Sequence, residues 1–245
     1  AFISHFQQRI RLDPISAMNK GLDPRFDILE TCPAAHTTIG GIRINHECAT
    51  NTPGLYAAGS VAGGIYGLAR PEGYTSMITL VFGRRAGLFA AEYSKQSRLQ
   101  KIDAKLLNTY IKKATSIIDN EKGSGVSEIK SKIRNTLSEF GWVIKDKEGL
   151  SKGIKQIRRI REKYPSFKVT NSRDWLNALE LCNMLLTAEL LLLGSLKRKE
   201  SRGAFFREEY PETDNKNWIK NITCQLASGI TVLKTSLLYT SDSAD

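Results

Sequence analysis

The stretch 36–93 alternates glycine-rich turns with short apolar segments, and it constrains the fold more than any other part of the chain. The apolar run 55–58 follows a Pro-Gly turn, which predicts a buried strand ending at Gly59. Further on, Thr75 or Ser76 can cap a helix that runs to about Tyr93. Strand, glycine loop and helix N-terminus together predict a cradle for an anion or a cofactor, because free N–H groups and the helix dipole converge there.

The predicted helix carries small residues at four-residue spacing, namely Gly83, Gly87 and Ala91. Such a smooth face predicts close packing against a neighbouring element. Any single glycine more often belongs to an ordinary loop or packing helix, so the cradle interpretation depends on the whole combination.

Three motifs stand in this stretch: His36-Thr-Thr-Ile-Gly-Gly-Ile42, Gly54-Leu-Tyr-Ala-Ala-Gly59, and Arg70 followed by Phe82-Gly83. Together they resemble the C-terminal part of the FAD domain in the succinate dehydrogenase and fumarate reductase flavoprotein family, to which L-aspartate oxidase also belongs. The resemblance continues to about Lys220. It implies an α/β remnant of an FAD-binding domain followed by an α-helical bundle domain.

The resemblance also implies a chemistry, in which flavin N5 exchanges hydride with the carbon–carbon bond of a dicarboxylate such as succinate or fumarate. Arg70 and His36 fall where the family binds the substrate carboxylates. A guanidinium suits this task because it binds a carboxylate bidentately and stays charged. We expect both side chains to point into one cavity beside the helix N-terminus, although no catalytic set is complete in this chain.

For the cofactor FAD, the resemblance implies contacts from six residues: Gly40, Gly41, Gly59, Ser60, Thr75 and Ser76. Two departures from the family pattern bear on specificity. Ser60 replaces a common Glu, and Pro71-Glu72 replaces a common Leu-Gly. An L-aspartate oxidase-like enzyme, or a reductase of another unsaturated acid, therefore stays open as an alternative.

From about Ile102 the periodicity changes to that of amphipathic helices, which predicts a bundle over 102–200 without strands between 126 and 199. Predicted helix caps are Asp103, Ser127, Asp146 and Asn171 or Ser172. In the longest helix we place Leu176, Leu179, Asn183, Leu186 and Leu190 on the inward face. We expect the bundle to serve as a scaffold and for contacts between subunits.

The segment 198–211 resembles a family signature where the helical domain returns toward the flavin domain, with Phe205 in place of a common His. Residues 236–245 resemble a translated sequencing adapter, and the family's Gly-rich phosphate loop is absent, so we expect a partial reading frame. The predicted divisions are 1–96, 97–200, 201–234 and a non-native tail 235–245.

The net charge of +11 suits anionic substrates, and the spread of the charges along helices argues against a nucleic-acid partner. Four scattered cysteines without a C-x-x-C predict no metal site. The longest apolar run, 184–193, is interrupted by Thr187 and Glu189, which predicts no membrane span. The resemblance implies that the partner is an iron–sulfur electron-transfer subunit and that the chain is located in the cytoplasm or on the inner face of the membrane. A different class stays open: a non-catalytic assembly module, or a split subunit completed by a second chain.

Overall fold

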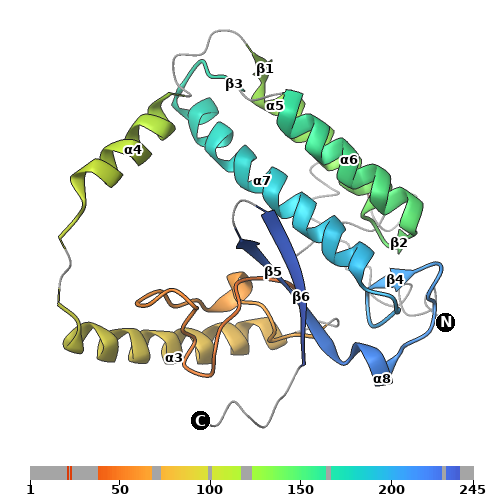
Figure 1. The fold of residues 1–245 in the computed structure, drawn as a ribbon, viewed down its shortest axis with the longest axis horizontal. Coiled ribbons are helices and arrows are strands. Elements are labelled where there is room, and N and C mark those ends of the chain that lie inside the picture. The colour runs from red at the N-terminus through yellow and green to blue at the C-terminus, as the bar shows by residue number, and fades with distance from the viewer. Residues whose placement is uncertain are drawn as a thin grey trace. The chain divides into compact units, whose positions relative to one another are not determined.

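The computed structural model describes residues 21, 23, 38–67, 73–98, 101–116, 123–163, 167–227 and 230–237 (Figure 1). The chain divides into two units, Ala1–Thr38 and Ile39–Asp245, and every described element lies in the second unit. A turn-rich portion is followed by long helices and a C-terminal hairpin (Figure 1). The mixture of helix and sheet and the helical region agree with the expected fold class, but every described strand lies after α4 (Ala104–Thr115) and none in the portion before it.

The turn-rich portion contains isolated bridges in place of a sheet. Ile42 pairs with Ala62 in parallel, and Ala49 pairs with Tyr56 antiparallel. The predicted buried strand over 55–58 is therefore wrong, because it reduces to a single bridge and Leu55 is exposed. A strand needs a continuous partner, and the described residues supply one bridge here. The short helix η1 (Gly59–Val61) follows directly.

Helix α3 (Tyr74–Gln96) begins after Gly73, which is its N-cap, rather than after Thr75 or Ser76. Gly73 has φ 77°, a left-handed conformation that glycine adopts without steric cost. The predicted cap residues therefore lie in the first helical turn. One side of α3 packs on the preceding loop, where Tyr93 meets the ring of Tyr56 edge to face at 6.4 Å.

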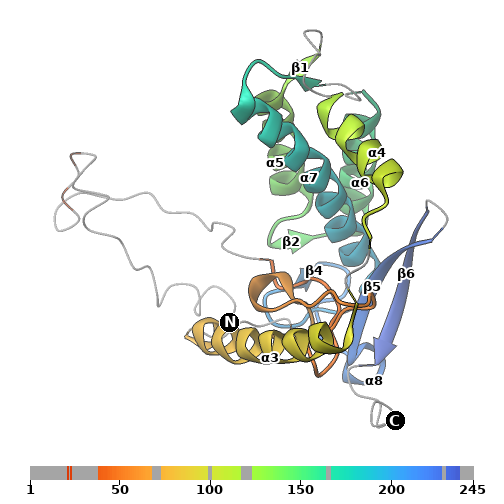
Figure 2. The same ribbon diagram turned by 90° about the vertical axis from the view of Figure 1, so that its left-hand side faces the viewer.

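Three helices form the core of the helical region: α5 (Val126–Phe140), α6 (Lys147–Lys163) and α7 (Ser172–Lys197). They lie side by side (Figure 2). Their buried apolar residues form one cluster. Its members are Val126, Ile129, Ile133, Leu150, Ile154, Ile157, Ile160, Ala178, Leu181, Leu185, Ala188 and Leu192.

Most of the predicted caps are confirmed. The Asp103 carboxylate accepts from Lys105 N–H at 2.9 Å and caps α4 (Ala104–Thr115). The Asp146 carboxylate accepts from Gly149 N–H at 2.8 Å, and the Asn171 side chain accepts from Asp174 N–H at 3.0 Å. The Ser127 prediction is wrong, because the chain enters α5 from Gly125.

The inward face predicted for α7 is largely wrong. Leu176 and Leu186 are exposed, while Leu181, Leu185 and Leu192 are buried. Helix α7 is apolar nearly all round, so the spacing of its leucines does not determine which stripe meets α5 and α6.

Two short parallel pairings contradict the expectation of no strands between 126 and 199. Strand β1 (Ser124–Gly125) pairs with β3 (Phe167–Lys168). Strand β2 (Ile144–Lys145) pairs with β4 (Phe206–Arg207). Each covers two residues beside a helix end, where loops run next to each other, and such short ladders leave no periodic signal in a sequence.

The chain returns through α8 (Asn215–Trp218) into the antiparallel hairpin of β5 (Lys220–Ala227) and β6 (Ile230–Leu237) (Figure 2). Ser236 pairs with Asn221, and Leu237 pairs with Lys220. Strand β6 therefore overlaps the first three residues of the segment 235–245 that we set apart. The boundary that we expected at residue 235 is therefore wrong, because β6 pairs with β5 as far as Leu237; residues 238–245 lie outside the described residues.

Candidate functional site

The two predicted substrate ligands, His36 and Arg70, lie outside the described residues. Their expected meeting in one cavity stays a prediction. The six predicted FAD contacts, in contrast, are all described, and they come from three short segments.

The first segment, Gly40-Gly41-Ile42, lies against the backbone of residues 61–63. Ile42 N–H donates to Val61 O at 2.8 Å, and Gly63 N–H donates to Ile42 O at 2.9 Å. A Cβ on Gly41 would lie 2.3 Å from Val61 O, so only glycine allows this approach. A Cβ on Gly40 would meet no atom within 4 Å, which leaves Gly40 facing open space.

The second segment, Gly59-Ser60, opens η1 and contacts α3. Gly59 is buried, and a Cβ there would lie 3.7 Å from the Thr79 methyl group in the second turn of α3. Ser60 is exposed, so its hydroxyl is accessible to a ligand.

The third segment is the N-terminus of α3, with Thr75 half-buried and Ser76 exposed in the first turn. The cap residue Gly73 offers no side-chain acceptor, and the first turn carries no acidic residue. The positive end of the helix dipole is therefore not balanced by a carboxylate of the helix itself. Such an end favours a negatively charged group, for example a phosphate or the pyrimidine side of a flavin, which becomes more negative on reduction.

The described residues fit a flavin in two respects. A Cβ on Gly40 or on Gly73 would meet no atom within 4 Å, so open space lies beside both glycines and a ligand can approach their backbone closely. The N-terminus of α3, which has no side-chain cap and no acidic residue in its first turn, favours a negatively charged group such as a cofactor phosphate. The structure thus brings Gly41, Gly59 and the start of α3 into one loop-and-helix unit.

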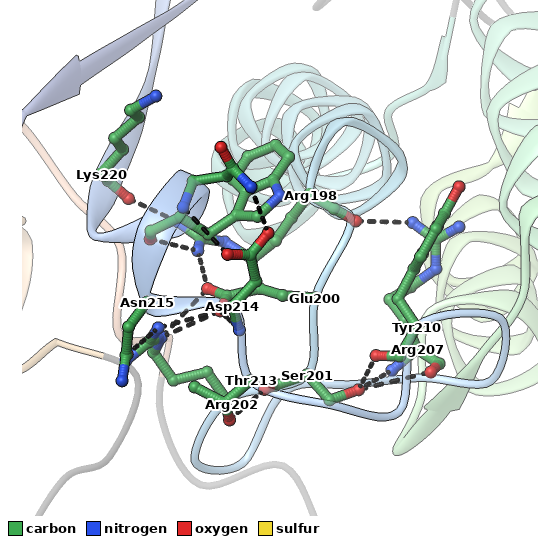
Figure 3. A network of polar contacts seen from close by, with 12 residues as sticks. Arg198, Glu200, Ser201, Arg202, Arg207, Tyr210, Thr213, Asp214, Asn215 and Lys220 are labelled. Carbon is green, nitrogen blue, oxygen red and sulfur yellow. Dashed lines mark hydrogen bonds and ion pairs between the residues drawn. The ribbon is translucent and has the colours of Figure 1, made fainter.

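Sequence reasoning missed the role of a buried ionic network in the return segment (Figure 3). Glu200 is fully buried and accepts hydrogen bonds from Arg198, from Arg202 at 2.9 Å and from Asp214 N–H at 3.0 Å. Burial alone would raise the pKa of this carboxyl. The donors outweigh burial, Arg202 first, and hold the pKa of Glu200 below its usual value.

The same network fixes the end of α7 to the hairpin. Arg207 is buried and donates to the carbonyls of Ser195 at 2.8 Å and Arg198 at 2.9 Å, at the helix C-terminus. Arg198 in turn donates to Lys220 O, the first residue of β5, at 2.6 Å (Figure 3). Two arginines thus join three segments that are separate in the sequence.

A third buried cation, Lys145, lies next to this network. Its ammonium group is 4.9 Å from the centre of the Phe205 ring and donates to Val143 O at 3.4 Å. Burial, with a smaller effect of Arg207, lowers the pKa of Lys145 from 10.5 to about 8. The departure from His to Phe at 205 thus places an aromatic face under a lysine, a contact that suits a cation.

The described residues contain no group of three or more His, Cys, Asp or Glu that could hold a metal ion. Among them, α7 is the helix long and apolar enough to cross a membrane, judged by length and composition alone. One stripe of this helix, including Leu181, Leu185 and Leu192, lies in the core of the bundle.

Two family models match the chain. The model of the FAD binding domain matches residues 3–76, and the model of the fumarate reductase flavoprotein C-terminus matches residues 130–237. The first match ends in the opening turn of α3. The second covers α6, α7, the hairpin and all of α5 except its first turn.

Similar proteins agree with these matches. The chain is 34% identical over 226 residues to an uncharacterised FAD-dependent oxidoreductase of Methanocaldococcus jannaschii, covering 90% of the chain and 41% of that protein. It is 32% identical over 233 residues to one of the subunits of the fumarate reductase (CoM/CoB) of Methanothermobacter marburgensis, with the same coverage.

A solved structure of the E. coli quinol fumarate reductase superposes with a TM-score of 0.84 at 26% identity, over 93% of the chain and 41% of that protein. The chain therefore spans about two fifths of the length of these relatives. An FAD-binding portion followed by a helical domain, as expected, is confirmed.

Proposed function

Because the chain belongs to the succinate dehydrogenase and fumarate reductase flavoprotein family, whose members are FAD-dependent oxidoreductases acting on CH–CH bonds, we propose that it is the C-terminal part of a flavoenzyme that reduces fumarate or a closely related unsaturated dicarboxylate. The single observation that carries this proposal is the N-terminus of α3, which has no side-chain cap and no acidic residue in its first turn, beside the glycine loop. FAD, when bound, would supply the hydride exchange.

This chain's own residues would hold the flavin and the acid. Gly40, Gly59 and Ser60 would lie along the cofactor, and the amides of the first turn of α3 would stabilise negative charge on the reduced flavin. Arg70 would bind one substrate carboxylate bidentately, with His36 as a second donor to the same group. Holding the acid at a fixed position aligns its carbon with the flavin.

The relatives carry both fumarate reductase and succinate dehydrogenase names, which supports the fumarate–succinate pair as the substrate, and we choose the direction of fumarate reduction for the test. L-aspartate is the alternative substrate, since Ser60 and Pro71-Glu72 depart from the family pattern. Relatives are named as subunits, which supports a partner subunit; following the family resemblance, we propose that this partner is an iron–sulfur electron-transfer subunit and that the chain is located in the cytoplasm or on the inner membrane face. A non-catalytic module is the remaining alternative.

The test uses a chimera in which the N-terminal part of the M. jannaschii relative, up to the matched region, precedes this chain. Purified chimera is assayed with reduced viologen as donor and with fumarate as acceptor, and separately for oxidation of L-aspartate. We expect fumarate-dependent turnover that Arg70→Ala abolishes and Arg70→Lys restores only partly, since lysine lacks the bidentate fork.

Turnover of L-aspartate without fumarate reduction would instead select the oxidase alternative. An Arg70→Ala chimera as active as the parent would contradict the substrate clamp. A chimera that binds FAD but reacts with neither acid would favour the non-catalytic alternative.

A further inference from the structure

One side chain of the C-terminal hairpin reaches the glycine loop. A Cβ on Gly64 would lie 3.9 Å from Nδ2 of Asn221, in β5, and would meet no other atom of the described residues within 4 Å. Strand β5 lies next to the turn-rich portion in Figure 2. Two segments that are far apart in the sequence therefore come into contact a few residues after Ser60, one of the predicted FAD contacts.

The loop is open where Asn221 touches it. Gly64 is exposed and has φ 86°, a left-handed conformation that favours glycine. The neighbouring Gly63 N–H donates to Ile42 O at 2.9 Å, which holds this part of the loop against the first segment of the site. Because Gly64 presents no side chain, Asn221 and a bound ligand can both approach the backbone of the loop.

The carboxamide of Asn221 has unused hydrogen-bonding capacity. The side chain is half-buried, and it makes no hydrogen bond to any residue that the structure describes. An amide side chain offers two N–H donors and an acceptor oxygen. These groups are therefore available to a ligand that lies along the glycine loop.

The buried ionic network fixes the backbone that carries Asn221. Arg198 donates to Trp218 O at 3.3 Å and to Lys220 O at 2.6 Å, immediately before Asn221 (Figure 3). The Glu200 carboxylate in turn holds the Arg198 guanidinium, and Asn221 itself is part of the ladder between β5 and β6. A side chain on such a rigid element can bind a ligand with little further loss of conformational entropy.

We propose that Asn221 is a further residue of the cofactor site and that its carboxamide hydrogen-bonds FAD where the glycine loop holds the cofactor. The contact with the loop, the unused amide and the fixed backbone support this assignment. A neutral amide suits FAD because it can donate to phosphate, hydroxyl or carbonyl oxygens without adding negative charge. The inference rests on the proposed function for the position of FAD along the loop, and not for the choice of the acid.

Two other roles for Asn221 predict different behaviour. A role in supporting the loop alone would depend on the shape of the side chain and not on its charge. A contact with the part of the relatives that this chain does not cover would make the loss of Asn221 lower the stability of a complete protein without changing its affinity for FAD.

The experiment measures the affinity of the FAD-free chimera described above for FAD, by titration followed through flavin fluorescence. Asn221→Ala removes the amide, and Asn221→Asp keeps its shape but replaces it by a carboxylate. Gln225→Ala and Gln225→Asp are the matched controls, because Gln225 is an exposed amide on the same side of β5, about 13 Å further along the strand. Urea midpoints of the chimeras without FAD are measured in parallel.

We expect Asn221→Ala to weaken FAD binding about fivefold, the factor that corresponds to the loss of one hydrogen bond. Asn221→Asp should weaken it further, because a carboxylate then lies next to a cofactor that carries two phosphates. Both Gln225 variants should bind FAD like the parent. The urea midpoint should be the same for Asn221→Ala and Gln225→Ala.

Parent-like affinity of Asn221→Ala would overturn the inference, whether or not the urea midpoint falls. Parent-like affinity of Asn221→Asp would also overturn it, because only the shape of the side chain would then matter. If the Asn221 variants weaken FAD binding while the parent chimera reduces no acid, the proposed substrate is refuted and this inference stands. A parent chimera that binds no FAD would refute both.

Discussion

Replacing the buried Glu200 by glutamine tests whether the ionic network holds the return segment to the helical core. The substitution preserves the size of the side chain and removes its charge. Arg198 and Arg202 then keep their charges next to a neutral amide, with Arg198 only 9% exposed. The new NH₂ group also faces guanidinium donors, which cannot accept its hydrogens.

The expected loss follows from this geometry. Removing one partner of a buried, hydrogen-bonded ion pair costs about 3–5 kcal/mol. For a chain of this size that corresponds to a fall in Tm of about 6–20 °C. Urea unfolding, followed by circular dichroism at 222 nm, gives the change in the free energy of unfolding at constant slope.

Glu180→Gln is the matched control. Glu180 pairs with Lys130 at 3.1 Å but is 66% exposed, so its loss should cost less than about 1 kcal/mol. Equal losses for the two variants would refute the reasoning, because the buried network would then contribute no more than a surface pair.

Three further changes test other parts of the structure. Lys145→Met should stabilise the chain at pH 7 by up to about 3 kcal/mol, and the difference should shrink toward pH 10. The pKa of Lys145 is about 8 in the folded chain, below its value of 10.5 in the unfolded chain. Between these two values the unfolded chain binds more protons, so the free energy of unfolding of the parent rises with pH. A stability difference between variant and parent that does not change with pH in urea titrations would contradict this. Gly41→Ala should speed hydrogen exchange at the Ile42 and Gly63 amides, because the new Cβ would collide with Val61 O. Gly40→Ala, whose Cβ meets no atom, should leave the exchange unchanged. Equal exchange rates in the two variants would exclude the close approach of Gly41 to the backbone of residues 61–63. Trp175→Phe removes the 2.9 Å hydrogen bond to Ala114 O and should speed exchange in α4 about fivefold, as expected for the loss of about 1 kcal/mol, with α5 unaffected.

Local signals in the sequence predicted the starts of several helices well. Asp103, Asp146 and Asn171 were predictable because an Asx side chain before an apolar period accepts the free N–H groups of the first turn. The start of α3 was not predictable in this way, since Gly73 caps by its backbone conformation and carries no acceptor. The inward face of α7 was missed because apolar residues surround that helix.

The candidate site likewise contains one feature that the sequence predicted and others that depend on contacts between distant parts of the chain. The close backbone approach at Gly41 was predictable because such an approach leaves a glycine signature in the sequence, whereas the residue at which α3 begins was not. The network around Glu200 was not, because its donors come from Arg198, Arg202 and the amide of Asp214, which meet only when the chain turns back. The contact of Lys145 with Phe205 depends in the same way on the pairing of β2 with β4.

Reoxidation of the reduced flavin by fumarate is the most direct test of the central claim. The chimera is reduced anaerobically with dithionite, and its absorbance at the flavin maximum is followed in a stopped-flow instrument after mixing with an acid. Fumarate should restore the oxidised spectrum in a single turnover, whereas succinate, the matched acid that cannot accept hydride, should leave the flavin reduced. A flavin that stays reduced with fumarate would contradict the assignment of this chain to a fumarate-reducing flavoenzyme.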